Sequence, residues 1–277
     1  MSSVCELLLE KPVKDDIIYI GGIEELSLVD VLEHTSFTVW FSFCNFRCPW
    51  CSNGTLARGL TKRKVSVDYI VSKVMEAKDF VDYFHVTGGE PTLQFKGLGK
   101  LLCRVKKYTN LPLSIDTNGT FPEVIERLLA IMNHVAMDIK APLNDIKKYS
   151  MSTGMPIKVV QHYIPRIIKT MKLIIRDVDF VEFRTTMVPK IIGPEEVKKI
   201  ALFLNRLLKY LKPRGRVVFV VQQFIPYEGI LDEHFRKEPR TDPNIVLETA
   251  KIVSEILDNV EVYYRTLEEG SIKMSKL

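Results

Sequence analysis

The chain has 277 residues, of which 46% are hydrophobic and 26% charged, and its 39 basic and 34 acidic side chains give a net charge of +5. These ordinary values exclude disordered and collagen-like chains, and the length is sufficient to bury a core without disulfide cross-links. Basic residues are scattered and no apolar run approaches the roughly 20 residues of a membrane span, so we expect neither a nucleic-acid nor a membrane partner.

Short runs rich in β-branched and aromatic residues alternate with helical patterns along the chain. The strand candidates, in chain order, lie at 36–43, 83–86, 113–116, 135–139, 180–187 and 216–221, with a weaker candidate at 260–264. Helices are predicted after the N-cap Ser66, over 98–105, and after the helix-opening prolines Pro122, Pro194 and Pro243. We expect the helix after Pro122 to run to about Met132, and the helix after Pro194 to end near Leu211. A helical pattern over 157–174 contains Pro165, which is expected to kink or split it.

About six strand–helix alternations indicate a parallel sheet, and strands of near-continuous apolar character fit a sheet that is covered on both faces. Two architectures agree with this pattern: an open doubly wound sheet, and a barrel or partial barrel with fewer than eight strands. Periodicity alone does not separate them. Since no linker or internal repeat interrupts the series, we interpret residues 36–277 as one domain and residues 1–35 as an N-terminal extension.

Polar residues interrupt this pattern at the carboxyl ends of the predicted strands. They lie at 44–51, 87–92, 116–119, 138–140, 184–186 and 222–223. Parallel strands end on one edge of their sheet, and α/β folds hold their active sites at that edge. We therefore expect these groups to form one site. For a single strand the simpler alternative is local, and Asp116 with Asn118 would then only shape a turn.

Three of the five cysteines, Cys44, Cys48 and Cys51, fall within eight residues as C-x3-C-x2-C. An odd number of cysteines disfavours a fully paired disulfide set, and Cys103 in an apolar stretch is interpreted as a buried core thiol. A structural zinc site would need a fourth ligand from elsewhere, such as His34 or His85. A 4Fe–4S cluster normally takes four cysteines, so three would leave one iron open to a ligand that is not protein.

The first ten residues carry Glu6 and Glu10 and lack the basic segment of a secretory signal. We therefore expect a cytoplasmic protein, in a compartment where thiols stay reduced.

The cysteine loop, Cys44-Asn-Phe-Arg-Cys48-Pro-Trp-Cys51, resembles that of the radical S-adenosylmethionine (SAM) superfamily, and Gly88-Gly-Glu-Pro resembles its GGEP strand. The segments Asp-Thr-Asn-Gly at 116–119 and Asp-Ile-Lys at 138–140 resemble the branch that activates glycyl-radical enzymes. Within that branch, 181–186 and 221–224 resemble the activating proteins of anaerobic ribonucleoside-triphosphate reductase. The match spans roughly residues 20–225. It implies an α/β fold in which parallel strands form a partial (βα)6 barrel similar to a TIM barrel.

The resemblance also implies a role for each matching residue. Cys44, Cys48 and Cys51 would hold one 4Fe–4S cluster, whose fourth iron would bind the amino and carboxylate groups of SAM. The implied cofactor-binding residues are Trp50, Ser52, Gly88, Gly89, Glu90, Asp116, Thr117, Asp138, Lys140 and Arg184. Trp50 and Ser52 would lie near the adenine, and Lys140 and Arg184 would offer positive charge to the carboxylate or ribose side. Glu90 would stabilise the amino end or pin the turn.

In this branch the positions matching Asp116, the backbone of Thr117 and Asp138 hold a monovalent cation beside the cofactor, so the resemblance implies one here. Two positions depart from relatives. Pro226-Tyr-Glu228 stands where the pyruvate formate-lyase activating branch has a histidine, which raises the question whether Glu228 replaces a cofactor contact. Ser52 stands where a histidine is common.

The implied activity is reductive cleavage of SAM to methionine and a 5′-deoxyadenosyl radical, which takes a hydrogen atom from a glycine of a partner protein. The partner would be a glycyl-radical enzyme, with anaerobic ribonucleotide reductase as the specific expectation, and the electron donor a flavodoxin or ferredoxin. No side chain is assigned a catalytic role, because the cluster and the cofactor carry the chemistry. Two alternatives stay open: a radical SAM enzyme that acts on a small molecule, similar to 7-carboxy-7-deazaguanine synthase, and a non-enzymatic iron–sulfur electron carrier.

Overall fold

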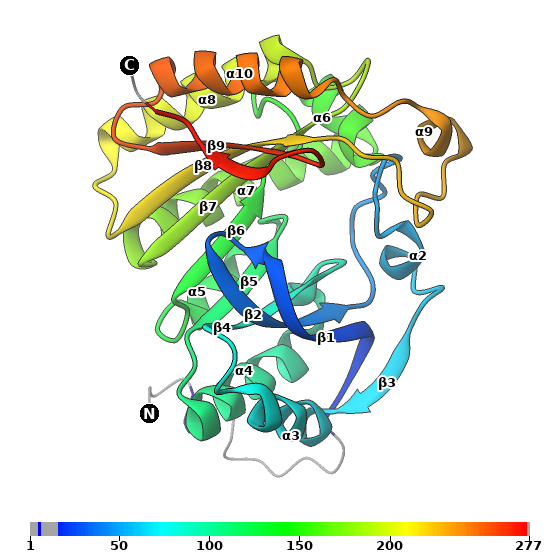
Figure 1. The fold of residues 1–277 in the computed structure, drawn as a ribbon, viewed down its shortest axis with the longest axis vertical. Coiled ribbons are helices and arrows are strands. Elements are labelled where there is room, and N and C mark those ends of the chain that lie inside the picture. The colour runs from blue at the N-terminus through cyan, green and yellow to red at the C-terminus, as the bar shows by residue number, and fades with distance from the viewer. Residues whose placement is uncertain (1–4, 7–15, 276–277) are drawn as a thin grey trace. The chain divides into compact units, whose positions relative to one another are not determined.

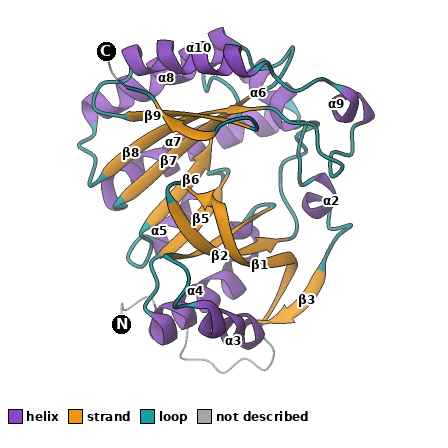
Figure 2. Cartoon of the chain, viewed as in Figure 1, coloured by secondary structure: helices purple, strands orange, loops and turns teal. Residues whose placement is uncertain are grey.

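The computed structural model describes residues 5–6 and 16–275, and these residues form an α/β fold in which helices alternate with a largely parallel set of strands (Figures 1 and 2). The predicted fold class is therefore confirmed. Two compact units divide the chain. Unit 1 comprises residues 1–45, 55–117 and 121–135, and unit 2 comprises residues 46–54, 118–120 and 136–277.

Unit 1 contains five strands in the order β3-β1-β2-β4-β5. Their bounds are β1 Ile17–Val31, β2 His34–Phe41, β3 Arg63–Ser66, β4 Tyr83–Gly88 and β5 Leu113–Thr117. The three predicted strands, β2, β4 and β5, pair in parallel, whereas β1 pairs antiparallel with β2 and β3. The helices are α3 Val67–Ala77, α4 Phe95–Thr109 and α5 Pro122–Leu128, with the 3-10 turn η1 at Pro91–Gln94. The short helix α2 Gly54–Ala57 starts where the chain passes back from unit 2 into unit 1.

In unit 2 the strands β7 Phe180–Met187, β8 Arg216–Gln223 and β9 Glu261–Thr266 pair in parallel, and β10 Gly270–Lys273 closes on β9 antiparallel. The strand β6 His134–Asp138 leads into this unit, where the N–H of Ile139 donates to the Arg184 carbonyl at 2.8 Å. Helices α6 Ile146–Thr153, α7 Ile157–Asp177, α8 Pro194–Tyr210, α9 Glu233–Lys237 and α10 Pro243–Ile256 complete it. In Figure 1, α8 and α10 lie side by side, with α10 against β8 and β9.

Local signals place most of these elements. The Ser66 hydroxyl accepts the Tyr69 N–H and so caps α3, and Pro194 and Pro243 occupy the first turns of α8 and α10 as predicted. Two expectations need correction. Of the kink or split expected at Pro165, the split does not occur, and helix α7 continues through the proline. Pro165 removes one backbone hydrogen bond, but a buried apolar face holds both halves of the helix. Helix α5 ends at Leu128, before the predicted Met132.

The prediction of a free thiol at Cys103 is wrong. Cys103 is buried, but it forms a disulfide with Cys5 across 98 residues of sequence. Cys44, Cys48 and Cys51 are not part of a disulfide. Among the helices that the structure describes, none combines the length and the apolar character needed to cross a membrane.

Candidate functional site

The GGEP segment is bonded directly to the chain that enters the cysteine loop (residues 44–51). The N–H of Gly89 donates to the Phe41 carbonyl and the N–H of Glu90 to the Phe43 carbonyl, both at 2.8 Å. A Cβ atom on Gly89 would lie 2.1 Å from the Phe43 oxygen and 3.3 Å from the Cys44 nitrogen. Only glycine permits this approach, so the two motifs that the sequence singled out meet beside Cys44.

Glu90 is fully buried and organises the end of β5. Its Oε1 accepts hydrogen bonds from the Thr92 N–H at 3.2 Å, from the Thr92 hydroxyl, and from the Thr117 hydroxyl at 2.9 Å. Of the two roles implied for Glu90, these contacts support pinning of the turn. They also hold Thr117 against the GGEP segment.

Asp116 ends a chain of buried polar groups that sequence reasoning missed. Its Oδ2 accepts from the Thr87 hydroxyl at 2.8 Å, and its Oδ1 lies 3.6 Å from His85 Nε2. His85 Nδ1 meets the Ser114 hydroxyl at 2.7 Å, and that hydroxyl meets His134 Nδ1 at 2.8 Å. His85, Ser114 and His134 are fully buried. The available signal was a polar residue inside each of three apolar strands, because such groups need partners.

Asn118 takes the simpler role that the sequence left open. Its Oδ1 accepts from the N–H and the hydroxyl of Thr120 at 3.0 and 2.7 Å, so it shapes the turn after β5.

In unit 2, Asp138 lies between two cations. Its Oδ2 is 2.9 Å from Lys140 Nζ and its Oδ1 is 3.3 Å from Arg184 Nε. The ammonium of Lys140 also lies 5.1 Å from the centre of the Trp50 ring. Trp50 itself is buried, and its indole Nε1 has no hydrogen-bond partner among the described residues. Four of the predicted site residues therefore gather at one place.

Lys140 faces the cysteine loop as well as Asp138. Burial alone would lower the pKa of Lys140, but the charges of Asp138, Cys48 and Cys51 raise that pKa above its ordinary value. The side chain therefore remains a cation at neutral pH. A protonated lysine beside two cysteines favours the thiolate form that metals bind.

Helices α6 and α7 both contact the cysteine loop. The N–H of Arg47 donates to the carbonyl of Thr153 on α6 at 2.8 Å, and the Phe46 ring lies 5.9 Å from the ring of Tyr163 on α7. Ser52, directly after the loop, is exposed, and its carbonyl lies against Gly229 in the segment after β8. The structure thus brings Ser52 close to the segment containing Glu228, where the sequence departs from its relatives.

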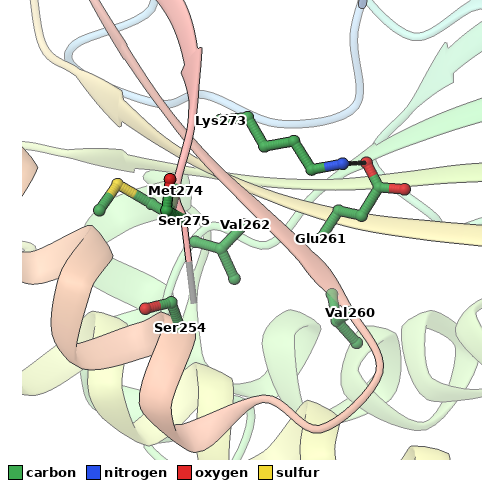
Figure 3. A pocket seen from close by; sticks show the side chains of 7 residues that line it. All are labelled: Ser254, Val260, Glu261, Val262, Lys273, Met274 and Ser275. Atoms are coloured by element: carbon green, nitrogen blue, oxygen red, sulfur yellow. Dashed lines mark ion pairs between the residues drawn. The ribbon is translucent and has the colours of Figure 1, made fainter. Parts of the chain in front are cut away.

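The described residues also form a cavity of about 360 Å³ away from these groups. It lies between α10 and the strands β9 and β10, and Figure 3 shows the Glu261–Lys273 ion pair at its wall. It contains none of the predicted site residues.

Comparisons with known proteins agree with these motifs. The sequence profile of the Radical SAM superfamily matches residues 38–204. A candidate glycyl-radical enzyme activating enzyme of Methanocaldococcus jannaschii is 32% identical over 88% of this chain and 95% of its own length. The pyruvate formate-lyase-activating enzyme of Staphylococcus aureus is 30% identical over 50% of this chain and 58% of its own. The solved structure of TYW1 with a lysine–pyruvate adduct aligns with a TM-score of 0.57 at 14% identity, covering 85% of this chain and 77% of that one, which shows a shared fold.

Proposed function

Because the chain belongs to the radical SAM superfamily and is a homologue of glycyl-radical enzyme activating enzymes, we propose that it cleaves SAM reductively and uses the 5′-deoxyadenosyl radical to take a hydrogen atom from a partner's glycine. The observation that carries this proposal is the direct hydrogen bonding of the GGEP segment to the entry of a loop that contains three cysteines outside any disulfide. Membership of this superfamily implies that the protein binds a 4Fe–4S cluster and SAM.

The donor set fits such a cluster. Cys44, Cys48 and Cys51 are partly exposed and outside any disulfide, and thiolates are the usual ligands of iron–sulfur clusters. Lys140 supplies positive charge beside two of them. We assign these three cysteines as the cluster ligands, which leaves one iron for the amino and carboxylate groups of SAM.

The remaining residues would bind and orient SAM. In unit 2, Lys140 and Arg184 can pair with the SAM carboxylate, since Asp138 holds both cations in place. Trp50 and the exposed Ser52 are assigned to the adenine side. In unit 1, Gly88 and Gly89 are kept as cofactor-binding residues by their position beside Cys44, because their missing Cβ atoms make room for the backbone of Phe41 and Phe43.

Glu90 is assigned to hold Thr117 and the GGEP turn, since its carboxylate accepts hydrogen bonds from the Thr92 N–H and the Thr117 hydroxyl. We keep a monovalent cation near Asp116, Thr117 and Asp138 as part of the proposal. The proposed cation rests on the motif resemblance alone. The contacts of Asp138 do not add to it, because this carboxylate already pairs with two cationic side chains in its own unit.

We propose a glycyl-radical enzyme as the protein substrate, with anaerobic ribonucleotide reductase as the first partner to test and a flavodoxin or ferredoxin as the electron donor. The similarity to candidate activating enzymes supports the class of partner. A cytoplasmic location stays a prediction from the sequence.

The test begins with anaerobically reconstituted, reduced protein and SAM, and 5′-deoxyadenosine is measured. Cys51→Ala is expected to abolish iron binding and SAM cleavage, whereas the control Cys5→Ser removes a cysteine outside the loop and is expected to retain both. Addition of anaerobic ribonucleotide reductase or pyruvate formate-lyase is then expected to give the glycyl-radical signal in electron paramagnetic resonance. SAM cleavage without a glycyl signal from any partner would overturn the substrate assignment. Absence of cleavage would leave only an iron–sulfur carrier.

A further inference from the structure

Helix α6 is fixed to the cysteine loop at its carboxyl end. The N–H of Arg47, the residue before Cys48, donates to the carbonyl of Thr153, the last residue of α6. The Thr153 hydroxyl in turn donates to the Tyr149 carbonyl at 2.7 Å. One turn of helix therefore separates the backbone of Tyr149 from the bond that holds the loop.

The hydroxyl of Tyr149 is a buried polar group that the fold leaves unused. The residue is fully buried, and its Oη has no hydrogen-bond partner among the described residues. Leaving a buried hydroxyl without a partner is unfavourable, so such a group calls for an explanation. Phenylalanine would fill the same space without this cost.

Lys140, Cys48 and Asp138 are the charged groups that act on Tyr149. Burial raises the pKa of Tyr149 above its ordinary value, Lys140 opposes the shift, and the negative charges of Cys48 and Asp138 add to it. The backbone N–H of Lys140 also faces the phenol oxygen, but outside hydrogen-bond geometry. Among the described residues, the hydrogen of the phenol has no acceptor. A hydrogen-bond acceptor beside Cys48 would give the Tyr149 hydroxyl the partner that it lacks among the described residues.

We propose that Tyr149 donates a hydrogen bond to a sulfur atom at the Cys48 corner of the iron–sulfur cluster and thereby raises the reduction potential of the cluster. This inference rests on the proposed function, because it needs the cluster that Cys44, Cys48 and Cys51 would hold. Hydrogen bonds to the sulfurs stabilise the more negative, reduced state, and they are one of the means by which proteins set cluster potentials.

The test compares Tyr149→Phe with wild type and with Tyr163→Phe, a matched control that removes a hydroxyl from a ring packed on the same loop. Each protein is reconstituted anaerobically without SAM or partner, its iron and sulfide are counted, and its midpoint potential is measured by titration with electron paramagnetic resonance. We expect Tyr149→Phe to hold the same iron at a more negative midpoint, and Tyr163→Phe to match wild type. In heavy water, the reduced wild-type cluster is expected to show a hyperfine coupling to an exchangeable deuteron that Tyr149→Phe lacks.

A second measurement addresses the fold. Since the hydroxyl has no partner without the cluster, Tyr149→Phe is expected to leave the thermal midpoint of the apoprotein unchanged or higher. An unchanged potential and coupling at full iron content would overturn the inference, as would a clear loss of apoprotein stability, which would assign the hydroxyl a partner within the protein. Failure of wild type to bind iron and sulfide would instead overturn the proposed function.

Discussion

At the scale of single residues, the two predicted aspartates differ in the way their charges are held. Asp138, in unit 2, pairs with Lys140 and Arg184, whereas Asp116, in unit 1, accepts from the Thr87 hydroxyl and lies near His85.

We expect Arg184 to bind SAM through the several N–H donors of its guanidinium group as well as through its charge. Arg184→Lys keeps the charge but loses the planar guanidinium that faces Asp138. We expect SAM affinity to fall about 10- to 100-fold, because hydrogen bonds to charged groups contribute about 1.5–3 kcal/mol. Isothermal titration of the reconstituted protein measures this, with Arg216→Lys as a control at an ion pair outside the candidate site. An unchanged affinity with intact iron content would remove Arg184 from the cofactor site.

Ser114 joins two buried histidines, so its loss leaves both without their shared partner. Ser114→Ala is expected to lower the free energy of unfolding by about 1–3 kcal/mol, the cost of an unsatisfied buried polar group. Chemical denaturation followed by circular dichroism measures the change. Ser72→Ala, which removes an exposed hydroxyl in α3, is the control and is expected to have little effect. Equal stability of the two variants would show that the histidines find other partners.

At the scale of elements, the junction between α6 and the cysteine loop depends on one residue. Gly154 ends α6 with φ of 63°, and a Cβ atom there would lie 2.1 Å from the Arg47 oxygen. Gly154→Ala therefore combines an unfavourable backbone conformation, which costs about 1–2 kcal/mol, with a collision against the loop. We expect lower stability and less than half the wild-type iron content after reconstitution. The control Gly193→Ala has only ordinary contacts, so it should retain its iron. Full iron content in Gly154→Ala would contradict a role for α6 in shaping the loop.

One carboxylate, that of Glu261, links the three strands at the end of unit 2. Glu261 on β9 accepts from Arg216 on β8 and pairs with Lys273 on β10, and these hydrogen bonds, against the effect of burial, lower its pKa to about 2. Because the folded protein holds the ionised form, the pair stabilises the fold fully above the ordinary pKa of 4.5. This contribution is lost as the pH falls through that value towards about 2.

Glu261→Gln should remove that part of the acid sensitivity. Wild type is expected to lose more stability than the variant between about pH 5 and about pH 2, as measured by denaturant midpoints across the range. Parallel pH profiles for the two proteins would show that Glu261 does not contribute.

The sequence could predict the elements whose signals are local. Strand β7 begins and ends where its apolar residues do, and Pro194 and Pro243 marked the starts of α8 and α10. Strand β1 was missed within the expected N-terminal extension, because bulges interrupt its register and many of its side chains are exposed. The motifs predicted the site residues. They could not predict the hydrogen bond between the Gly89 N–H and the Phe41 carbonyl or the position of Tyr149, because both depend on contacts between distant segments.

At the scale of the whole molecule, the disulfide between Cys5 and Cys103 is the feature that the sequence could least provide. Cysteine spacing does not reveal pairing, and a reduced compartment was expected. In the chain-entropy account, closing a loop of 98 residues stabilises a protein by about 4–5 kcal/mol. Cys5→Ser is expected to lose stability of this order in the absence of reductant, as measured by guanidinium denaturation. Once wild type is reduced, the two proteins should unfold alike, and a difference that persists would assign the effect to packing.

The same cross-link bears on how the protein is handled. Reducing an iron–sulfur cluster requires strong electron donors, and such reagents also reduce a buried disulfide when the protein opens locally. Two batches prepared in air and under dithionite would then differ in covalent structure as well as in metal oxidation state. A loss of turnover on storage could arise from either change, and the serine variant at position 5 provides material in which only one of them can occur.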